Sequence, residues 1–377
     1  MLGESPSHTL GTDIATVDLR RSFFGDKERR VLAFGGLEAW LFTYETGVEA
    51  VRIAHPRGHV VVLPFMGQIV WDAAFDGVPL TMTSMFDAPR RATTIVETYG
   101  ALAYHAGLLR NGVPGADDDH ALHGEMPCAP MTAAGLCCGT DTAGAFLAVT
   151  GEYEYAMGFG AHYRARPRVL VRAEAASIEI VMEVENLSAR PMDLMYLCHV
   201  NFAFVEGGRI VQPVPYDPAT VVARTAIPSF VTASDDYRAL IDELARNPGR
   251  MEVLDEPDRY DPEQVFYIKG LRPGPDGLVH FAMLRPQGDA ITIAYDPVVM
   301  PHTIRWVLAG SDQRVAAFAM PATCEPEGYR AELRKGNVRS LAGGAVARFE
   351  TRLGYADRQA ATDVVRRIEA QRTGEPA

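Results

Sequence analysis

The feature that most constrains the fold is a long succession of short β-prone segments divided by turn-forming residues. Residues 30–34, 39–44, 49–54 and 59–64 are such segments, and Gly, Glu-Thr-Gly and Pro-Arg-Gly turns separate them. Further segments of this kind lie at residues 145–155, 162–173, 177–184, 278–285, 290–296, 303–308, 314–320 and 345–353. Parallel strands need crossovers of about a dozen residues, usually helical, and these segments do not alternate with helical ones. The sequence therefore predicts an all-β, mainly antiparallel chain of stacked sheets with few helices.

Three stretches depart from this pattern. Residues 234–246 combine a polar N-cap with an amphipathic repeat and are followed by Pro248, so they predict a helix. Residues 357–372 carry apolar side chains on one side and predict a terminal helix. Residues 101–130 are rich in Gly, Asp, Pro and His and predict a long loop with functional side chains.

The expected domain organisation follows from these patterns. The chain has 377 residues, and large β-sandwiches can exceed 250 residues as one unit. We expect a lead-in arm at residues 1–29, one β domain at residues 30–356, and a C-terminal helix and tail at residues 357–377. The arm is expected to pack on the body or on a partner subunit, which is compatible with a homodimer.

The net charge and the composition indicate which classes of binding partner suit this protein's surface. The net charge of −12 argues against nucleic acid and against an anionic membrane surface, because both attract positive proteins. The five cysteines show no CxxC spacing, and the sequence contains neither a signal-peptide pattern nor about 18 consecutive apolar residues. We therefore expect a cytoplasmic protein that acts on a small molecule.

A few polar side chains stand out as candidates for chemistry. His199 lies in the stretch of residues 186–204, most of which is apolar or aromatic near this position, and burial or a nearby carboxylate would set its charge near neutral pH. Arg110, His123 and Glu125 lie in the predicted loop, and Glu325 follows an apolar strand segment and precedes Pro326. An imidazole and a carboxylate that face each other can transfer protons near pH 7.

Four short motifs in sequence order resemble the landmarks of the galactose mutarotase-like, or aldose 1-epimerase, superfamily. They are Gly107-Leu-Leu-Arg-Asn-Gly, Leu122-His-Gly-Glu, Leu197-Cys-His-Val-Asn-Phe and Cys324-Glu-Pro. The resemblance covers roughly residues 30–354 and implies a β-supersandwich with an open sugar-binding cleft.

The resemblance also implies roles for individual residues. Glu325 would be the general base at the anomeric hydroxyl, and His199 would be the general acid at the ring oxygen, kept protonated by a carboxylate such as Glu325. Arg110 and His123 would bind sugar oxygens. The product would be the other anomer, formed without a cofactor.

The chain departs from the family pattern at several positions. Cys198 replaces the usual Asn before the catalytic His, and Glu125 replaces the second Gly of Leu-His-Gly-Gly. Glu125 therefore joins the candidate substrate-binding residues. The family's substrate-binding Asp has its best counterpart in Glu263 or Gln264. Such departures indicate a divergent member, and they leave the identity of the sugar open.

Two alternatives remain open at this point. His123, Glu125, His199 and Glu325 have the donor types that bind Zn²⁺ or Mn²⁺, so a metal-dependent sugar isomerase or epimerase is one alternative. A carbohydrate-binding protein without turnover is the other, because a fold alone does not establish function. Among the aromatic residues, Tyr196, Phe202 or Trp306 could stack on a sugar ring.

Overall fold

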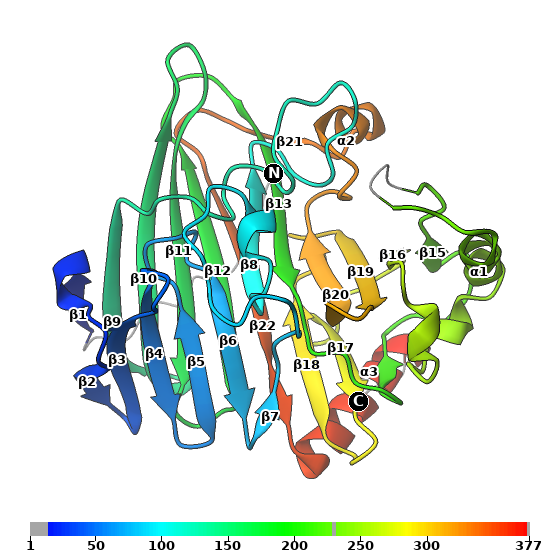
Figure 1. Ribbon diagram of the computed structural model, residues 1–377, viewed down its shortest axis with the longest axis horizontal. Coiled ribbons are helices and arrows are strands. Elements are labelled where there is room, and N and C mark those ends of the chain that lie inside the picture. The colour runs from blue at the N-terminus through cyan, green and yellow to red at the C-terminus, as the bar shows by residue number, and fades with distance from the viewer. Residues whose placement is uncertain (1–13, 228–230, 375–377) are drawn as a thin grey trace.

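The computed structural model of the protein describes residues 14–227 and 231–374, and within them two antiparallel sheets carry most of the chain (Figure 1). The predicted all-β, mainly antiparallel sandwich is confirmed. Of the expected segments, residues 1–13 of the arm and residues 375–377 of the tail lie outside the described residues.

The smaller sheet has nine strands. Its order is β1 (Ala15–Leu19), β9 (Ala133–Asp141), β10 (Gly144–Ala156), β11 (His162–Arg172), β12 (Ser177–Asn186), β22 (Val346–Ala356), β18 (Ala290–Tyr295), β17 (Val279–Leu284) and β14 (Arg209–Val211). Strand β1 pairs with β9 from Ala15 to Leu19, so this part of the predicted arm belongs to the sheet.

The larger sheet has thirteen strands. Its order is β15 (Val221–Ala223), β16 (Gln264–Ile268), β19 (His302–Ala309), β20 (Arg314–Ala322), β13 (Met192–Val200), β8 (Ala103–Leu108), β6 (Val70–Phe75), β5 (Gly58–Val62), β4 (Glu49–His55), β3 (Leu37–Thr43) and β2 (Arg29–Phe34). The short strands β21 (Arg339–Leu341) and β7 (Val78–Pro79) pair with β13 and β6.

The described residues form three α-helices, of which one packs against β14, β17, β18 and β22 of the smaller sheet (Figure 1). The predicted helices are present as α1 (Asp235–Arg246) and α3 (Arg358–Thr373), and α2 (Tyr329–Lys335) was not predicted. The hydroxyl of Ser234 accepts a hydrogen bond from the backbone N–H of Tyr237, which satisfies a free donor at the start of α1. Short 3₁₀ turns complete the chain at Arg21–Phe23, Ile95–Thr98, Pro248–Met251 and Pro257–Arg259.

The predicted long loop at residues 101–130 was partly wrong, because β8 lies at the centre of the larger sheet. Every residue of this strand, Ala-Tyr-His-Ala-Gly-Leu, is buried. A strand covered on both faces shows no alternation of polar and apolar residues, so its pattern resembles a loop when Gly, Ala and His occupy it. The loop proper begins after Leu108.

Alternation along the larger sheet creates two apolar layers. One face, which includes Cys198 and Tyr196, packs against the smaller sheet in the main core. The other face, which includes Leu197 and Trp306, builds a second apolar cluster. The ring of Tyr196 stacks on Phe349 of the smaller sheet with centroids 4.4 Å apart, so the two sheets meet directly behind the strand that carries His199.

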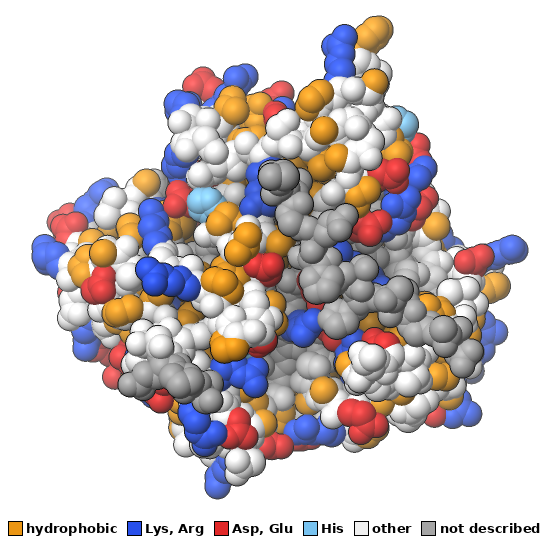
Figure 2. Space-filling view, turned by 180° about the vertical axis from the view of Figure 1, so that it is seen from behind, with side chains coloured by type: hydrophobic (Ala, Val, Ile, Leu, Met, Phe, Trp, Pro, Cys, Tyr) orange, Lys and Arg blue, Asp and Glu red, His pale blue; other side chains and the backbone are white. Residues whose placement is uncertain are grey.

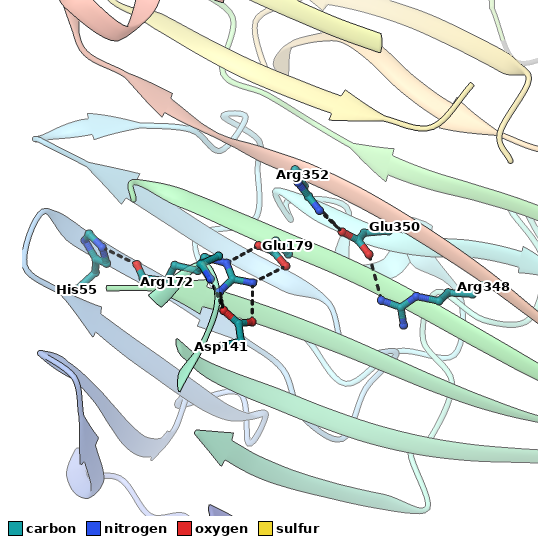
Figure 3. Close-up of polar contacts among 8 residues, drawn as sticks. His55, Asp141, Arg172, Glu179, Arg348, Glu350 and Arg352 are labelled. Atoms are coloured by element: carbon teal, nitrogen blue, oxygen red, sulfur yellow. Dashed lines mark hydrogen bonds and ion pairs between the residues drawn. The ribbon is translucent and has the colours of Figure 1, made fainter. Parts of the chain in front are cut away.

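Charged side chains also tie strands together (Figure 3). The Arg172 guanidinium donates to the carboxylates of Asp141 and Glu179, at 2.8 and 2.6 Å, and its backbone carbonyl lies 3.0 Å from Nε2 of His55 on the other sheet. Since the side chains of Arg172 and Glu179 are only 14% and 13% exposed, this network is screened less than surface pairs. Figure 2 shows hydrophobic and charged side chains intermingled on the face of the molecule that it views.

Removal of the aromatic contact between the sheets tests this account of the core. Phe349 is 1% exposed, and Phe349→Ala is expected to lower the free energy of unfolding by about 3–5 kcal/mol, because the cavity left behind cannot fully close. Urea titration followed by tryptophan fluorescence measures the change. Phe159→Ala, at an exposed position, is the matched control. Equal losses in the two variants would contradict the proposed core.

Candidate active site

A cavity of ≈ 470 Å³ opens on the outer face of the larger sheet. Most of its lining side chains are apolar, and its polar ones, apart from Gln313, belong to two groups. The first group contains His123, His199, Tyr99 and Trp306, and the second contains Arg224, Asp261 and Glu263. An apolar cavity with a few convergent polar groups is the usual form of a small-molecule site.

Strand β13 positions His199. The strand pairs with β8 and β20, and His199 lies opposite Tyr104 of β8. Tyr104 stacks on the imidazole with ring centroids 4.6 Å apart and an interplanar angle of 12°. The hydroxyl of Tyr99 lies 3.4 Å from Nε2, and Trp306 contacts the ring edge to face. The imidazole is therefore fixed in orientation by packing on several sides.

The second imidazole, His123, lies beside the first. Their ring centroids are 4.7 Å apart, and His123 has a φ of 63° within the tight turn after β8. The two side chains are buried, and Nδ1 of each has no hydrogen-bond partner among the described residues. Nε1 of Trp306 is also without a described partner. Because buried polar atoms normally make hydrogen bonds, three unsatisfied nitrogens in the lining side chains of one cavity set this region apart from the core.

Burial sets the protonation of both imidazoles. It lowers the pKa of His199 well below its usual value, and the proximity of His123 lowers it further. Burial lowers the pKa of His123 to about 3. The expectation that a carboxylate keeps His199 protonated was therefore wrong: no carboxylate is among the groups that shift its pKa, and desolvation favours the neutral ring.

The second polar group sits where β15 and β16 meet. The backbone N–H of Arg224 donates to the carbonyl of Val265, and its guanidinium lies 2.5 Å from Oε1 of Glu263. The same guanidinium lies 3.9 Å from Glu327, which accepts a hydrogen bond from the Tyr267 hydroxyl. Burial raises the pKa of Tyr99, and the negative charge of Glu263 raises it further. The carboxylate of the second polar group therefore acts electrostatically on a member of the first.

Glu325 does not line the cavity. One carboxylate oxygen accepts a hydrogen bond from Nζ of Lys335 at 2.7 Å, and the other lies 3.8 Å from Nζ of Lys269. Its backbone N–H donates to the buried carboxylate of Glu332, which Lys335 also binds. No described contact joins Glu325 to His199. The pairing of these two groups across one hollow stays a prediction.

Arg110 and Glu125 also point away from the cavity lining. Arg110 donates to the carbonyl of Leu109, and its guanidinium lies 3.7 Å from the ring centroid of Tyr329. Glu125 accepts hydrogen bonds from the backbone N–H groups of Leu108 and Leu109, at 2.9 and 2.8 Å, and from the Tyr163 hydroxyl. Glu125 therefore holds the turn after β8, where the related motif has glycine.

The structure distinguishes the two candidates, Glu263 and Gln264, for the counterpart of the family's substrate-binding Asp. Glu263 lines the cavity, whereas Gln264 is buried on the other side and donates to the carbonyls of Arg259 and Pro262. The alternative metal ligands are not brought together, because Glu125 and Glu325 have the partners described above. Within residues 14–227 and 231–374, no group of three or more His, Cys, Asp or Glu side chains could hold a metal ion.

The four sequence motifs nevertheless meet in space. The backbone N–H of Gly107 donates to the carbonyl of His123, and that of Val113 donates to the carbonyl of Pro326. At Gly112, a Cβ atom would lie 2.3 Å from the backbone of Pro326, so only glycine allows this approach. The motifs thus build the wall beside His199, although several of their polar side chains face outward.

Sequence reasoning missed four of the polar residues around the cavity. Tyr99, Arg224 and Asp261 line the cavity and Tyr104 stacks on His199, and all four come from segments with weak patterns that only the tertiary fold brings together. Opposite charges at Arg224 and Glu263, each beside a β-prone run, were the one available signal. Of the three aromatic candidates, Trp306 lines the cavity, whereas Tyr196 and Phe202 are in the main core.

Comparison with solved structures identifies the fold. A Klebsiella pneumoniae protein assigned provisionally to the aldose 1-epimerases superposes with a TM-score of 0.79 at 15% identity and covers 96% of each chain. A galactose mutarotase-like protein of Clostridium acetobutylicum gives 0.54 at 11% identity, with 88% of this chain and 98% of that one covered. A galactose mutarotase related enzyme of Lactobacillus acidophilus gives 0.52 at 11% identity, with 82% and 98% covered.

These likenesses place the chain in the structural class of the galactose mutarotase-like, or aldose 1-epimerase-like, β-sandwiches, as the sequence motifs indicated. Within that class, the chain belongs to the family described as "Domain of unknown function (DUF4432)", whose model matches residues 45–354. No curated protein matches the chain by sequence. Among the described helices, none is long and apolar enough to cross a membrane.

The depressed pKa of His123 predicts how stability depends on pH. The unfolded chain binds a proton near pH 6.5, whereas the folded chain does so only near pH 3, so acidification below about 6.5 favours unfolding. This imidazole contributes a slope of up to about 1.4 kcal/mol per pH unit. His123→Asn, which suits the positive φ, is expected to make stability less sensitive to pH between about 6.5 and 4. Urea titrations at several pH values measure both slopes, and identical slopes would contradict the assignment.

Proposed function

We propose that the protein binds a sugar or sugar derivative in the cavity and interconverts its anomers by acid–base catalysis. The observation that carries this proposal is the pair of buried imidazoles, His123 and His199, that lie side by side in the lining of a mostly apolar cavity. Trp306 adds a face on which a sugar ring can stack. The likeness in fold to aldose 1-epimerase-like proteins supports the same reaction class.

The reaction requires little more than a positioned proton carrier. Opening of a cyclic hemiacetal moves a proton from the anomeric hydroxyl to the ring oxygen, and closure on the other face reverses the transfer. Both oxygens are bonded to the same carbon. One imidazole within hydrogen-bond reach of that carbon can therefore accept the proton from the first oxygen and return it to the second, so that no proton is gained or lost.

We assign this proton transfer to His199. Its ring is held by Tyr104, Tyr99 and Trp306, and a fixed orientation is what general acid–base catalysis needs. A neutral imidazole has a free lone pair, so it starts as the base rather than as the acid. His123 is near enough to hydrogen-bond the same group of oxygens.

We assign binding of the remaining hydroxyls to the Arg224–Glu263 pair. Both side chains are largely buried at the cavity, 9% and 17% exposed, and together they offer guanidinium donors and carboxylate acceptors. Glu325 would then act through structure, since Nζ of Lys335 donates to one carboxylate oxygen at 2.7 Å and Nζ of Lys269 lies 3.8 Å from the other.

Three variants separate these roles. His199→Asn is expected to slow anomer exchange by about 10²–10⁴-fold, because it removes the proton carrier. Glu263→Gln is expected to raise KM about tenfold through loss of a charged acceptor. Glu325→Gln is the matched carboxylate control and should lower stability more than turnover. NMR exchange spectroscopy of reducing aldoses gives the rates.

A different pattern of variant effects would indicate that Glu325, and not His199, is the general base. Loss of turnover in Glu325→Gln, with turnover retained in His199→Asn and the stability of both variants unchanged, would contradict our assignment. Sugar binding without any acceleration in the unaltered protein would favour a carbohydrate-binding protein without turnover.

The pH profile distinguishes a neutral from a protonated imidazole. Because burial lowers the pKa of His199 well below 6.5, the base stays unprotonated as the pH falls from about 8 to 6, and kcat/KM for anomer exchange should stay level. An enzyme that needs the imidazolium would instead gain activity on acidification through this range. The buffer-catalysed rate, measured with His199→Asn, is subtracted at each pH.

A further inference from the structure

The rim of the cavity carries exposed apolar side chains. Met85 is 58% exposed and Val96 is 54% exposed, and both line the cavity together with Phe86. Exposed apolar groups beside a cavity are costly in water, and they mark surfaces that a ligand covers. They lie outside the polar groups that the sugar would contact.

The backbone of this rim is held in a defined conformation by hydrogen bonds. The backbone N–H of Arg90 donates to the Thr98 hydroxyl at 3.0 Å, and Thr46 donates to the carbonyl of Pro89. Thr94 begins the 3₁₀ turn Ile95–Thr98 with a capping box. The exposed side chains therefore stand on a preformed wall, which reduces the entropic cost of binding.

The charge of the lining is unsuited to an anionic ligand. Among the described lining side chains, Arg224 is the cation, and Asp261 and Glu263 are carboxylates. Arg224 is already paired with Glu263, and Glu327 lies 3.9 Å from it. A phosphate or carboxylate on the substrate would meet two or three negative charges and no unpaired guanidinium, which like-charge repulsion opposes.

The volume of the cavity indicates a ligand larger than a single unsubstituted sugar. Its ≈ 470 Å³ lies within the range of roughly 300–1,000 Å³ that accommodates drug-sized ligands, which are larger than one pyranose. Because a single pyranose is smaller than this volume, a sugar held at His199 and Glu263 would leave part of the apolar lining, which includes Met85, Phe86 and Val96, uncovered. Polyhydroxylated groups would lose hydration there without gaining partners.

We infer that the substrate is an uncharged reducing sugar with an apolar substituent at a carbon other than C1, and that Met85, Phe86 and Val96 bind this substituent. The inference rests on the proposed function, which requires a free anomeric hydroxyl. The sugar occupies the histidine and arginine end, and the substituent lies against the rim.

The test compares three probes in both the gluco and the galacto series: the free aldose, its 6-O-benzyl ether and its 6-phosphate. NMR exchange spectroscopy gives kcat/KM for anomer exchange, and saturation-transfer NMR gives binding. The benzyl ether is expected to bind about tenfold or more tightly than the free aldose, because the rim buries its ring. The 6-phosphate is expected to bind more weakly than the free aldose.

Two variants locate the effect. Val96→Asp is expected to reduce the preference for the benzyl ether over the free aldose about tenfold, because it places a charge against the aromatic ring. Val298→Asp, at a 73% exposed valine that does not line the cavity, should leave the preference unchanged. An equal loss in both variants would overturn the assignment of the rim.

The outcomes separate this inference from the proposed function. Acceleration of the free aldose with no preference for the benzyl ether, or with a preference for the 6-phosphate, overturns the inference and leaves the function standing. Tighter binding of the benzyl ether without any acceleration supports the rim and overturns the function. Absence of binding by all probes overturns both.

Discussion

The contact on which the site depends is the stacking of His199 on Tyr104 across the β8–β13 pair. Both strands are buried on both faces, so the imidazole has no solvent to stabilise its charged form. The main core behind β13, where Tyr196 stacks on Phe349, prevents the strand from moving to relieve this burial. The neutrality of the imidazole is thus a property of the sandwich and not of one neighbouring residue.

The sequence allowed the fold class to be predicted because its turns and β-prone segments are local signals. It also allowed the segments that meet around His199 to be identified, because each short motif must adopt the close backbone contacts seen at Gly107, Gly112 and Gly124. The strand β8 was missed because a doubly buried strand of small residues lacks alternation. Arg224 and Tyr99 were missed because only strand order, which local patterns do not contain, brings them to the cavity.

The departures from the family motif have physical consequences in this chain. Glu125, at a position where the motif has glycine, uses its carboxylate on two backbone N–H groups and the Tyr163 hydroxyl. That arrangement stabilises the turn that presents His123 at positive φ. A residue type typical of ligand binding thus serves the backbone, and sequence position alone could not distinguish the two uses.

Glu325 is a second carboxylate that the family motif suggests for the active site and whose contacts in this chain are structural. A carboxylate that is 11% exposed needs compensation, and Lys335 and Lys269 supply it from α2 and the end of β16. A base so tightly paired would have to break an ion pair before it accepted a proton, which would raise the barrier. His199 makes no such pair: burial and the nearby His123 hold its pKa well below the usual value, which keeps the ring neutral with a free lone pair but makes it a weaker base. Charge compensation therefore separates two groups that the motif alone would join, and of the two only His199 lines the cavity.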